Sequence, residues 1–285
     1  MESIAKRSIP DKVACYNHAM FDQVLSIMRM FAFGPMLALG FLIGSFVFWK
    51  KGKEEYYDQN SLMDAMLISC FWVFIGARLG YIAVRFPLFG FDILKWFSLV
   101  AQPGYLGIIG LVAGYVSLRY FAKKHKWDVY EILDFGALGV TIAYVFINLG
   151  MFLNGSGFGN ATTLPVGLYF PGVFDKRHPV QLYSMIFSFL LFITLWRLES
   201  VYRTYIWYRA NKRTAQTGFL IAIFCVAFGI FGAVISFFSN SFFLILGIPL
   251  EFFFMLALTL YGIGVLYVRS GRVLFPKKQK KKEDE

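Results

Sequence analysis

Two short segments place cationic side chains where they could hold an anion. Arg177 and His178 directly precede Pro179, a residue that favours the first turn of a helix. A histidine beside an arginine at a helix start can act as a base or as an anion ligand. Arg78 lies within an apolar run, where a charge costs about 2.5–3.5 kcal/mol, so we expect it to have a function. A guanidinium group suits a phosphate because it offers two parallel donors.

The neighbours of Arg78 favour the close approach of another group. Gly76, Ala77 and Gly80 are small, so a helix or a lipid headgroup can come near the backbone there. We expect Arg78 to bind phosphate. The alternative is an arginine that snorkels to the interface or is paired structurally.

A glycine-rich stretch, NGSGFGN at residues 154–160, follows another apolar run that contains Asn148 and ends near Asn154. Such a turn can present backbone N–H groups to an anion, and the alternative is a plain turn. Glu131 and Asp134 stand at the opposite end of the same run, three residues apart and on one helical face. We interpret these two carboxylates as partners for loop Lys and Arg, not as a catalytic pair.

The elements that must position these residues are membrane spans. The chain has 285 residues, of which 58% are hydrophobic and only 16% are charged, against about 25% charged residues in soluble proteins. The apolar residues form blocks of about 20, the length at which a helix crosses a bilayer. We predict an all-α polytopic membrane protein. The same composition excludes disordered, collagen-like and disulfide-scaffold classes.

Seven apolar runs are long enough to span the membrane as helices. They lie near Met28–Trp49, Leu62–Val84, Gly104–Phe121, Tyr130–Leu153, Val180–Trp196, Gly218–Phe238 and Phe242–Val268. Residues 1–27 are polar and mixed, so we expect no cleaved signal peptide. The chain is then divided into an extracytoplasmic segment (1–27), a seven-helix domain (28–268) and a basic cytoplasmic tail (269–285).

The 28 Lys and Arg residues alternate between the two sides of this arrangement. Nineteen fall in the tail and in the loops after the first, third and fifth spans, eight fall on the other side, and one is Arg78. The positive-inside rule then predicts that the N-terminus is outside and the C-terminus is inside. With this topology Arg78, Asn148, Asn154, Arg177 and His178 all lie near the outer leaflet. A cluster of this kind at headgroup depth suits an anionic lipid.

Other function classes lack a signal in the sequence. The basic run Lys277–Lys282 directly follows the last span, which indicates a topology anchor that touches anionic lipid and not a nucleic-acid site. The three separated cysteines give neither metal-ligand spacing nor a disulfide framework, and we expect no metal and no cofactor. No internal repeat is visible, so a channel or transporter is the least favoured class.

The order of these motifs resembles that of the prolipoprotein diacylglyceryl transferase family, from about Phe21 to Val268. The run Arg177-His178-Pro179-x-Gln181-Leu182-Tyr183 is the most specific element of the likeness. The other matching elements are Phe21-Asp22, Phe33-Gly34, Gly40-Phe41, Asp64, Gly76–Tyr81, Asp134, Phe152–Gly155, Gly159 and Phe170-Pro171. Seven spans with this orientation also agree with the family.

The resemblance implies a reaction at the outer leaflet of the bacterial plasma (inner) membrane. Members of this family transfer the diacylglyceryl group of phosphatidylglycerol to the lipobox cysteine thiol of a prolipoprotein. The reaction needs a cation for the departing phosphate and an acceptor for the thiol proton. The resemblance implies His178 and Arg78 as catalytic residues. The substrate-binding residues expected in this chain are Arg78, Asn148, Asn154, Gly155, Arg177, Gln181 and Tyr183.

Several polar positions of the family are replaced in this chain. The family motif Arg-x-Gly-Asn-Phe-x-Asn-Gly-Glu falls on Asn148–Ser156, which lacks the Arg, the first Asn and the Glu. A family His, a Tyr, an Arg and a Glu fall on Ile108, Phe33, about Gly232 and about Ser236, respectively. Because catalytic groups act as a unit, this loss favours a second hypothesis: a catalytically silent relative that binds anionic phospholipid or lipoprotein precursors. A transferase with a rearranged site is the first hypothesis.

Overall fold

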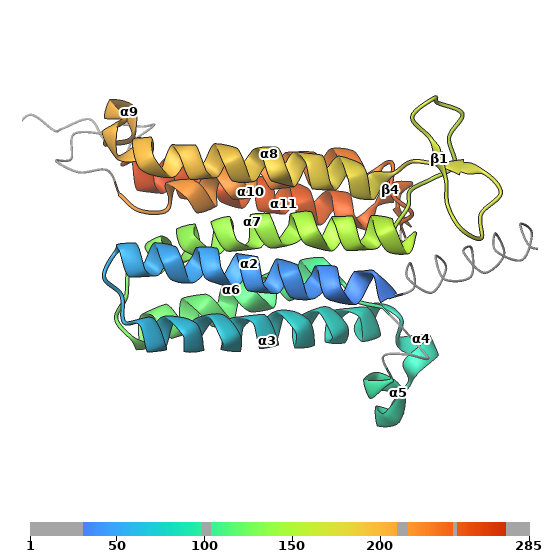
Figure 1. Ribbon diagram of the computed structural model, residues 1–285, viewed down its shortest axis with the longest axis horizontal. Helices are drawn as coiled ribbons and strands as arrows, with labels where there is room; N and C mark the ends of the chain where they lie inside the picture. Colours follow the sequence, from blue (N-terminus) through green and yellow to red (C-terminus); the bar gives the residue numbers. More distant parts are fainter. Residues whose placement is uncertain (1–30, 99–103, 210–215, 242–243, 272–285) are drawn as a thin grey trace, which may run out of the picture.

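The structure, a computed structural model, describes residues 31–98, 104–209, 216–241 and 244–271. Within these residues, long helices run side by side (Figure 1). They are α2 (Phe33–Glu54), α3 (Gln59–Val84), α6 (Gly107–Lys124), α7 (Val129–Asn154), α8 (Val180–Val201), α10 (Phe219–Ser236) and α11 (Leu250–Ser270). The predicted N-terminal segment 1–27 and most of the basic tail lie outside the described residues.

Short elements lie at the two ends of the helix bundle (Figure 1). The end that carries two β-hairpins is called the hairpin end, and the opposite end is called the basic end. The hairpin end holds α4 (Phe86–Phe89), α5 (Ile93–Phe97), β1 (Leu168–Tyr169), β2 (Lys176–Arg177), β3 (Leu244–Ile245) and β4 (Ile248–Pro249). The strands pair antiparallel, β1 with β2 and β3 with β4. The basic end holds η1 (Tyr202–Thr204) and α9 (Ile206–Arg209).

Helix α7 lies in the middle of the bundle, where it contacts α2, α6, α8 and α10 (Figure 1). Two further helices pack on these neighbours of α7: α3 packs on α6, and α11 packs on α10. Leu138 of α7, Leu195 of α8 and Leu220 of α10 meet in the main core, and each is almost completely buried. The central helix therefore joins two groups of helices that are far apart in the sequence.

Glycines let α2 and α7 approach each other closely. A Cβ atom on Gly44 would lie 2.7 Å from the carbonyl oxygen of Gly139, and a Cβ atom on Gly139 would lie 2.8 Å from that of Gly44. Real side chains do not tolerate such contacts, so the two backbones themselves form the interface. Gly40 and Gly44 are four residues apart, a spacing typical of close helix packing in membranes.

The two acidic residues of α7 have different partners. Glu131 lies 3.5 Å from the Arg203 guanidinium and accepts a hydrogen bond from the Tyr57 hydroxyl at 2.5 Å, so its predicted pairing with a loop cation is confirmed. The prediction for Asp134 is wrong. Its buried carboxylate accepts hydrogen bonds from the backbone N–H groups of Gly218 and Ile221, at 2.8 Å each. Asp134 thus caps the start of α10, whose first amides have no helical partner.

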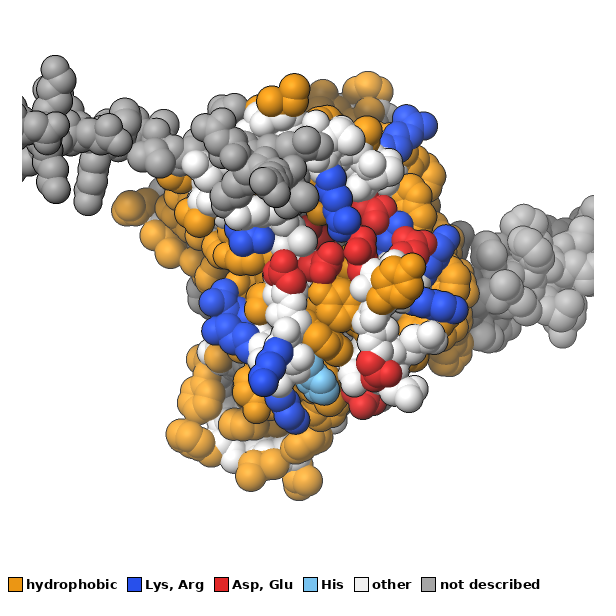
Figure 2. Space-filling view, turned by 90° about the vertical axis from the view of Figure 1, so that its left-hand side faces the viewer, with side chains coloured by type: hydrophobic (Ala, Val, Ile, Leu, Met, Phe, Trp, Pro, Cys, Tyr) orange, Lys and Arg blue, Asp and Glu red, His pale blue; other side chains and the backbone are white. Residues whose placement is uncertain are grey.

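Charged side chains gather at the basic end, where acidic residues form a band flanked by Lys and Arg (Figure 2). Lys51 of α2 is buried there and contacts Glu54 at 2.8 Å and Glu199 of α8 at 2.7 Å. Its ammonium group also lies 4.3 Å from the centre of the Trp196 ring. This cluster ties α2 to α8. Tyr57, in the connection after α2, has a pKa raised above its ordinary value by burial and by the Glu131 carboxylate.

The prediction of a helical, multi-pass membrane protein is confirmed by six helices among the described residues that are long and apolar enough to cross a membrane. They are α2, α3, α7, α8 with η1, α10 and α11. The predicted third run corresponds to α6, which has 18 residues and does not belong to this set. The predicted start of the last run, at Phe242, is wrong. Leu244–Pro249 forms the β3–β4 hairpin and α11 begins only at Leu250.

The close contact of α2 with α7 predicts an effect of a single methyl group. Gly44→Ala should lower the free energy of unfolding by about 1–3 kcal/mol, because the added carbon overlaps the Gly139 carbonyl. Gly264→Ala is the matched control, because a Cβ there meets no atom within 4 Å. Thermal unfolding of both variants in detergent measures the difference. Equal melting temperatures for the two variants would contradict the close packing.

Candidate functional site

At the hairpin end, the glycine-rich loop joins three helices. The backbone N–H of Gly159 donates to the His178 carbonyl at 2.8 Å, and the His178 N–H donates to the Asn160 carbonyl at 3.1 Å. The Asn160 N–H donates to the Phe238 carbonyl, also at 2.8 Å. These bonds connect the end of α7, the start of α8 and the end of α10. Arg177 and His178 are thereby brought next to the loop, as the sequence predicts for one site.

The loop uses many of its own amides for folding. Gly155 has a left-handed φ of 72° and ends α7, where its N–H donates to the Phe152 carbonyl. The N–H groups of Ser156, Gly159 and Asn160 also donate to carbonyl oxygens. Anion binding by the other amides of the loop stays a prediction. The loop also holds the cationic residues in place.

Arg177 has an unsatisfied guanidinium group. The side chain is half-buried, and its Nε atom is shielded from solvent without a hydrogen-bond partner among the described residues. It also forms no ion pair with the part of the chain that the structure describes. Its guanidinium carbon lies 5.9 Å from the centre of the Phe158 ring. A partly buried cation of this kind is stabilised by an anion that supplies the missing acceptors.

His178 follows Arg177 in the chain and lies in an aromatic setting. The residue is 8% exposed, and its ring packs edge-on against Phe238 at 5.1 Å between centres. The Nδ1 atom of His178 is 3.4 Å from the Tyr183 hydroxyl, one helical turn further along the chain. The Tyr183 contact orients the imidazole ring. Among the described residues, the other ring nitrogen, Nε2, has no hydrogen-bond partner.

The predicted amide ligands have structural partners. Gln181 is almost completely buried and donates from Nε2 to the Ser156 carbonyl, while its Oε1 has no partner among the described residues. Asn148 donates to the Tyr144 carbonyl at 2.7 Å. Asn154 donates weakly to the Ser156 hydroxyl, at 3.5 Å. Of the three amides, Gln181 therefore offers an acceptor atom that a substrate donor could use.

Arg78 is buried and its donors point at backbone carbonyl groups. Its Nε donates to the Trp96 carbonyl, Nη1 to that of Gly104 and Nη2 to that of Ser98, at 3.1 Å each. The guanidinium also lies 5.2 Å from the centre of the Phe89 ring. These contacts hold the segment with α4 and α5 against α3. The phosphate-binding role of Arg78 stays a prediction, and the structure adds a role in anchoring this segment.

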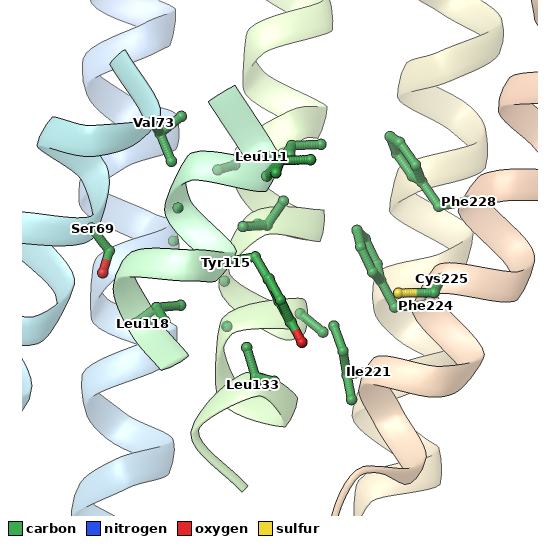
Figure 3. Close-up of a pocket in the computed structure, with 18 of the residues that line it drawn as sticks. Ser69, Val73, Leu111, Tyr115, Leu118, Leu133, Ile221, Phe224, Cys225 and Phe228 are labelled. Carbon is green, nitrogen blue, oxygen red and sulfur yellow. The ribbon is translucent and has the colours of Figure 1, made fainter. Parts of the chain in front are cut away.

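A cavity of about 490 Å³ lies between α2, α3, α6, α7, α10 and α11. Figure 3 shows its lining, with Leu111 and Tyr115 of α6 facing Phe224 and Phe228 of α10. Among the described residues that line it, none is charged. The volume falls within the range of about 300–1,000 Å³ that holds small organic ligands. An apolar space of this kind suits a hydrocarbon chain and not a headgroup.

Several side chains that hold the loop in place carry no clear signal in the sequence. Asn240 donates to the carbonyls of Phe158 and Gly159 at 3.4 Å, and the Asn160 side chain donates to the Phe237 carbonyl at 3.2 Å. An asparagine directly after an apolar run is a weak signal for such a tie. Its partners, 82 and 81 residues away, could not be inferred from the local pattern. The cavity likewise depends on six separate helices.

The fold and the site together define a multi-pass helical membrane protein with a cationic, His-containing site at one end of its bundle. The sequence profile described as prolipoprotein diacylglyceryl transferase matches residues 23–268. The chain belongs to the prolipoprotein diacylglyceryl transferase family.

Individual relatives support this assignment over most of their length. A phosphatidylglycerol–prolipoprotein diacylglyceryl transferase of Clostridium tetani is 26% identical over 223 residues, which cover 74% of this chain and 81% of that protein. One of Wolbachia pipientis subsp. Culex pipiens is 31% identical over 219 residues, which cover 70% and 80%. One of Methylobacillus flagellatus is 27% identical over 278 residues, which cover 90% and 99%.

The positions where the resemblance places further polar family residues are packed by this chain's own side chains. Ile108 lines the apolar cavity. A Cβ on Gly232 would lie 2.5 Å from the Met255 sulfur, which leaves no room for an arginine in this packing. Ser236 is buried and donates to the Ala233 carbonyl at 2.7 Å. Gly232 and Ser236 are thus packed in the core, whereas Ile108 faces the cavity.

The anchoring role of Arg78 can be measured without any lipid. Arg78→Ala should expose the segment 85–104 to protease and lower the free energy of unfolding by at least about 2 kcal/mol, because three carbonyls lose a charged donor. Limited proteolysis in detergent, followed by mass spectrometry, locates the new cleavage sites. Arg177→Ala is the control, since that guanidinium makes no such bond to the described residues. Unchanged proteolysis of Arg78→Ala would leave phosphate binding as its role.

Proposed function

We propose that this chain transfers the diacylglyceryl group of phosphatidylglycerol to the lipobox cysteine thiol of a prolipoprotein. The family to which the chain belongs supports this reaction. The observation that carries the proposal is the half-buried guanidinium of Arg177, which has no anion among the described residues and directly precedes His178 in the chain. An anion holder next to a group that can accept a proton is what the reaction needs.

The roles follow from the order of bond changes. His178 takes the proton of the cysteine thiol on a neutral ring nitrogen. The thiolate sulfur then attacks the glycerol carbon that carries the phosphate, so a C–S bond forms as the C–O bond breaks. The electron pair of the C–O bond remains on the phosphate oxygen, and glycerol phosphate leaves. Arg177 stabilises the negative charge on this leaving group.

The other predicted site residues act around this pair. Arg78 anchors the α4–α5 segment at the edge of the site and is the second candidate cation for the phosphate. Gln181 accepts a substrate donor at Oε1, and Tyr183 orients His178. Asn154 and Gly155 shape the loop that faces the substrate, and Asn148, within α7, is a further candidate substrate ligand.

The proposed topology places the hairpin end at the outer leaflet of a bacterial plasma (inner) membrane. In this arrangement α6 is a seventh crossing, the N-terminus is outside and the C-terminus is inside. The excess of Lys and Arg on one side supports this orientation. The chain is divided into segment 1–27, the transmembrane domain 28–268 and the basic tail 269–285.

One observation favours a second candidate function, that of a catalytically silent binder of anionic phospholipid or lipoprotein precursors. Positions that carry polar groups in the family are filled here by Ile108, Gly232 and Ser236, and the central cavity has no charged lining among the described residues. Catalytic groups act together, so the remaining ones seldom replace those that are lost. Binding of lipid needs only Arg177 and an apolar cavity.

Reconstitution separates the two functions. The purified protein is incubated with labelled phosphatidylglycerol and a lipobox peptide, and diacylglyceryl-peptide is detected by mass spectrometry. For a transferase, His178→Ala and Arg177→Ala should each lower the rate by about 100-fold or more. Lys176→Ala is the control, because this neighbour faces the Tyr169 ring, 5.7 Å away, and should keep the wild-type rate.

Wild-type protein that is folded and retains phosphatidylglycerol but forms no product would refute the transferase. That result would support the silent binder, provided that Arg177→Ala weakens lipid retention.

A further inference from the structure

A polar column runs down α6 from the cavity toward the basic end. Tyr115 lines the cavity, and its hydroxyl lies 2.7 Å from the hydroxyl of Tyr261 on α11. Arg119, one helical turn below, donates to the same Tyr115 hydroxyl at 3.1 Å. Lys123 follows after another turn and is exposed. A hydroxyl, a guanidinium and an ammonium group therefore follow one another along one face of the helix.

This column stands at an opening of the cavity. Helix α6 packs on α3 and α11 packs on α10, and the two helices face each other across the cavity. Three lining residues, Val112 on α6 with Phe254 and Tyr261 on α11, are 54%, 40% and 38% exposed. The cavity thus communicates with the lipid-facing surface between α6 and α11. The Tyr115–Tyr261 hydrogen bond crosses this opening.

Arg119 has few partners for its charge. Its hydrogen bond to Tyr115 uses one of five donors, and it forms no ion pair with a carboxylate of the described residues. It lies five residues before the end of α6, about 7–8 Å along the helix axis. A charge at such a depth is costly unless an anion or water satisfies it. A phosphate group is the anion that a guanidinium binds best in a membrane.

A second guanidinium lies near the same end. Arg269 of α11 sits over the Tyr130 ring, 4.5 Å from its centre, and donates to the carbonyl and hydroxyl oxygens of Thr217 at 2.8 Å. Arg269 is therefore already held by the protein. Among the described residues on the α6 side of the opening, Arg119 keeps donors without a partner and Lys123 forms no ion pair.

We propose that the opening between α6 and α11 binds an anionic phospholipid of the leaflet at the basic end. One acyl chain occupies the apolar cavity, the tyrosine pair contacts the polar ester region, and Arg119 binds the phosphate. Lys123 adds a second positive charge near the phosphate. This site lies at the opposite end of the bundle from Arg177 and does not depend on the transferase reaction.

The order of groups fits a phospholipid better than a free phosphate. Chain, ester oxygens and phosphate of a lipid follow each other along the membrane normal, as do the cavity, Tyr115 and Arg119. A free phosphate would leave the cavity empty, and an uncharged lipid would leave Arg119 without an anion. Both parts of the site are used by one amphipathic anion.

The headgroup contact is tested on the full-length protein. Native mass spectrometry counts the lipids retained after exchange into phosphatidylglycerol or into zwitterionic phosphatidylcholine. Arg119→Ala should retain one phosphatidylglycerol fewer than the wild type, with at least about tenfold weaker binding, and Arg119→Lys should recover part of it. The control is Arg197→Ala, an exposed arginine near the same end on α8. It should retain as many lipids as the wild type.

The chain contact is tested by filling the cavity. Leu258→Trp places a large ring into the lining, and Leu256→Trp places the same ring on the exposed face of α11. The first variant should lose the Arg119-dependent lipid, and the second should keep it. Unchanged melting temperatures in detergent show that the variants are folded.

Two results would overturn the proposal: equal lipid counts for Arg119→Ala and the wild type, or equal retention of phosphatidylcholine and phosphatidylglycerol. Persistence of the lipid in Leu258→Trp would refute the placement of its acyl chain. Absence of transferase activity would refute the proposed function but leave this lipid count unchanged. The lipid that depends on Arg177 is counted separately with Arg177→Ala.

Discussion

A polar group enclosed between helices in a membrane must find a partner inside the protein, and this constraint decides what each charged residue does here. Arg78 gives its donors to three carbonyl groups, Asp134 accepts two amides at the start of α10, and Lys51 lies between two glutamates. These groups hold the fold together. Arg177 and Arg119 differ because the described part of the chain gives them no anion.

The central helix α7 connects the two ends of the molecule. At the basic end its Asp134 fixes the start of α10, and at the hairpin end the loop that follows it is bonded to the end of α10. Between these points, α7 meets α2 through the Gly44–Gly139 contact. A shift of α7 would therefore move Arg177 and His178 together with the loop. The site is built on a rigid element, which favours fixed geometry.

Charge and apolar space are separated in this protein. The candidate catalytic pair lies at the hairpin end, whereas the central cavity carries no charged lining among the described residues. With Ile108, Gly232 and Ser236 at these positions, the interior can hold hydrocarbon chains but has few side chains that can transfer protons. Membership of the family is consistent with either catalysis by fewer groups or retained lipid binding. Whether the protein catalyses the transfer or only binds lipid depends on Arg177 and His178.

The sequence by itself determined the helical class and most span positions, because hydropathy is a local property and each span is continuous in the chain. It also predicted that Arg177, His178 and the glycine-rich loop lie near the same end of the bundle, through the topology that the Lys and Arg distribution implies. It could not predict the carbonyl partners of Arg78, which are 18 to 26 residues away, or the capping role of Asp134, whose partners are 84 and 87 residues away. Nor could it predict the β3–β4 hairpin or the cavity. These features depend on which helices pack together, and only the tertiary structure decides that.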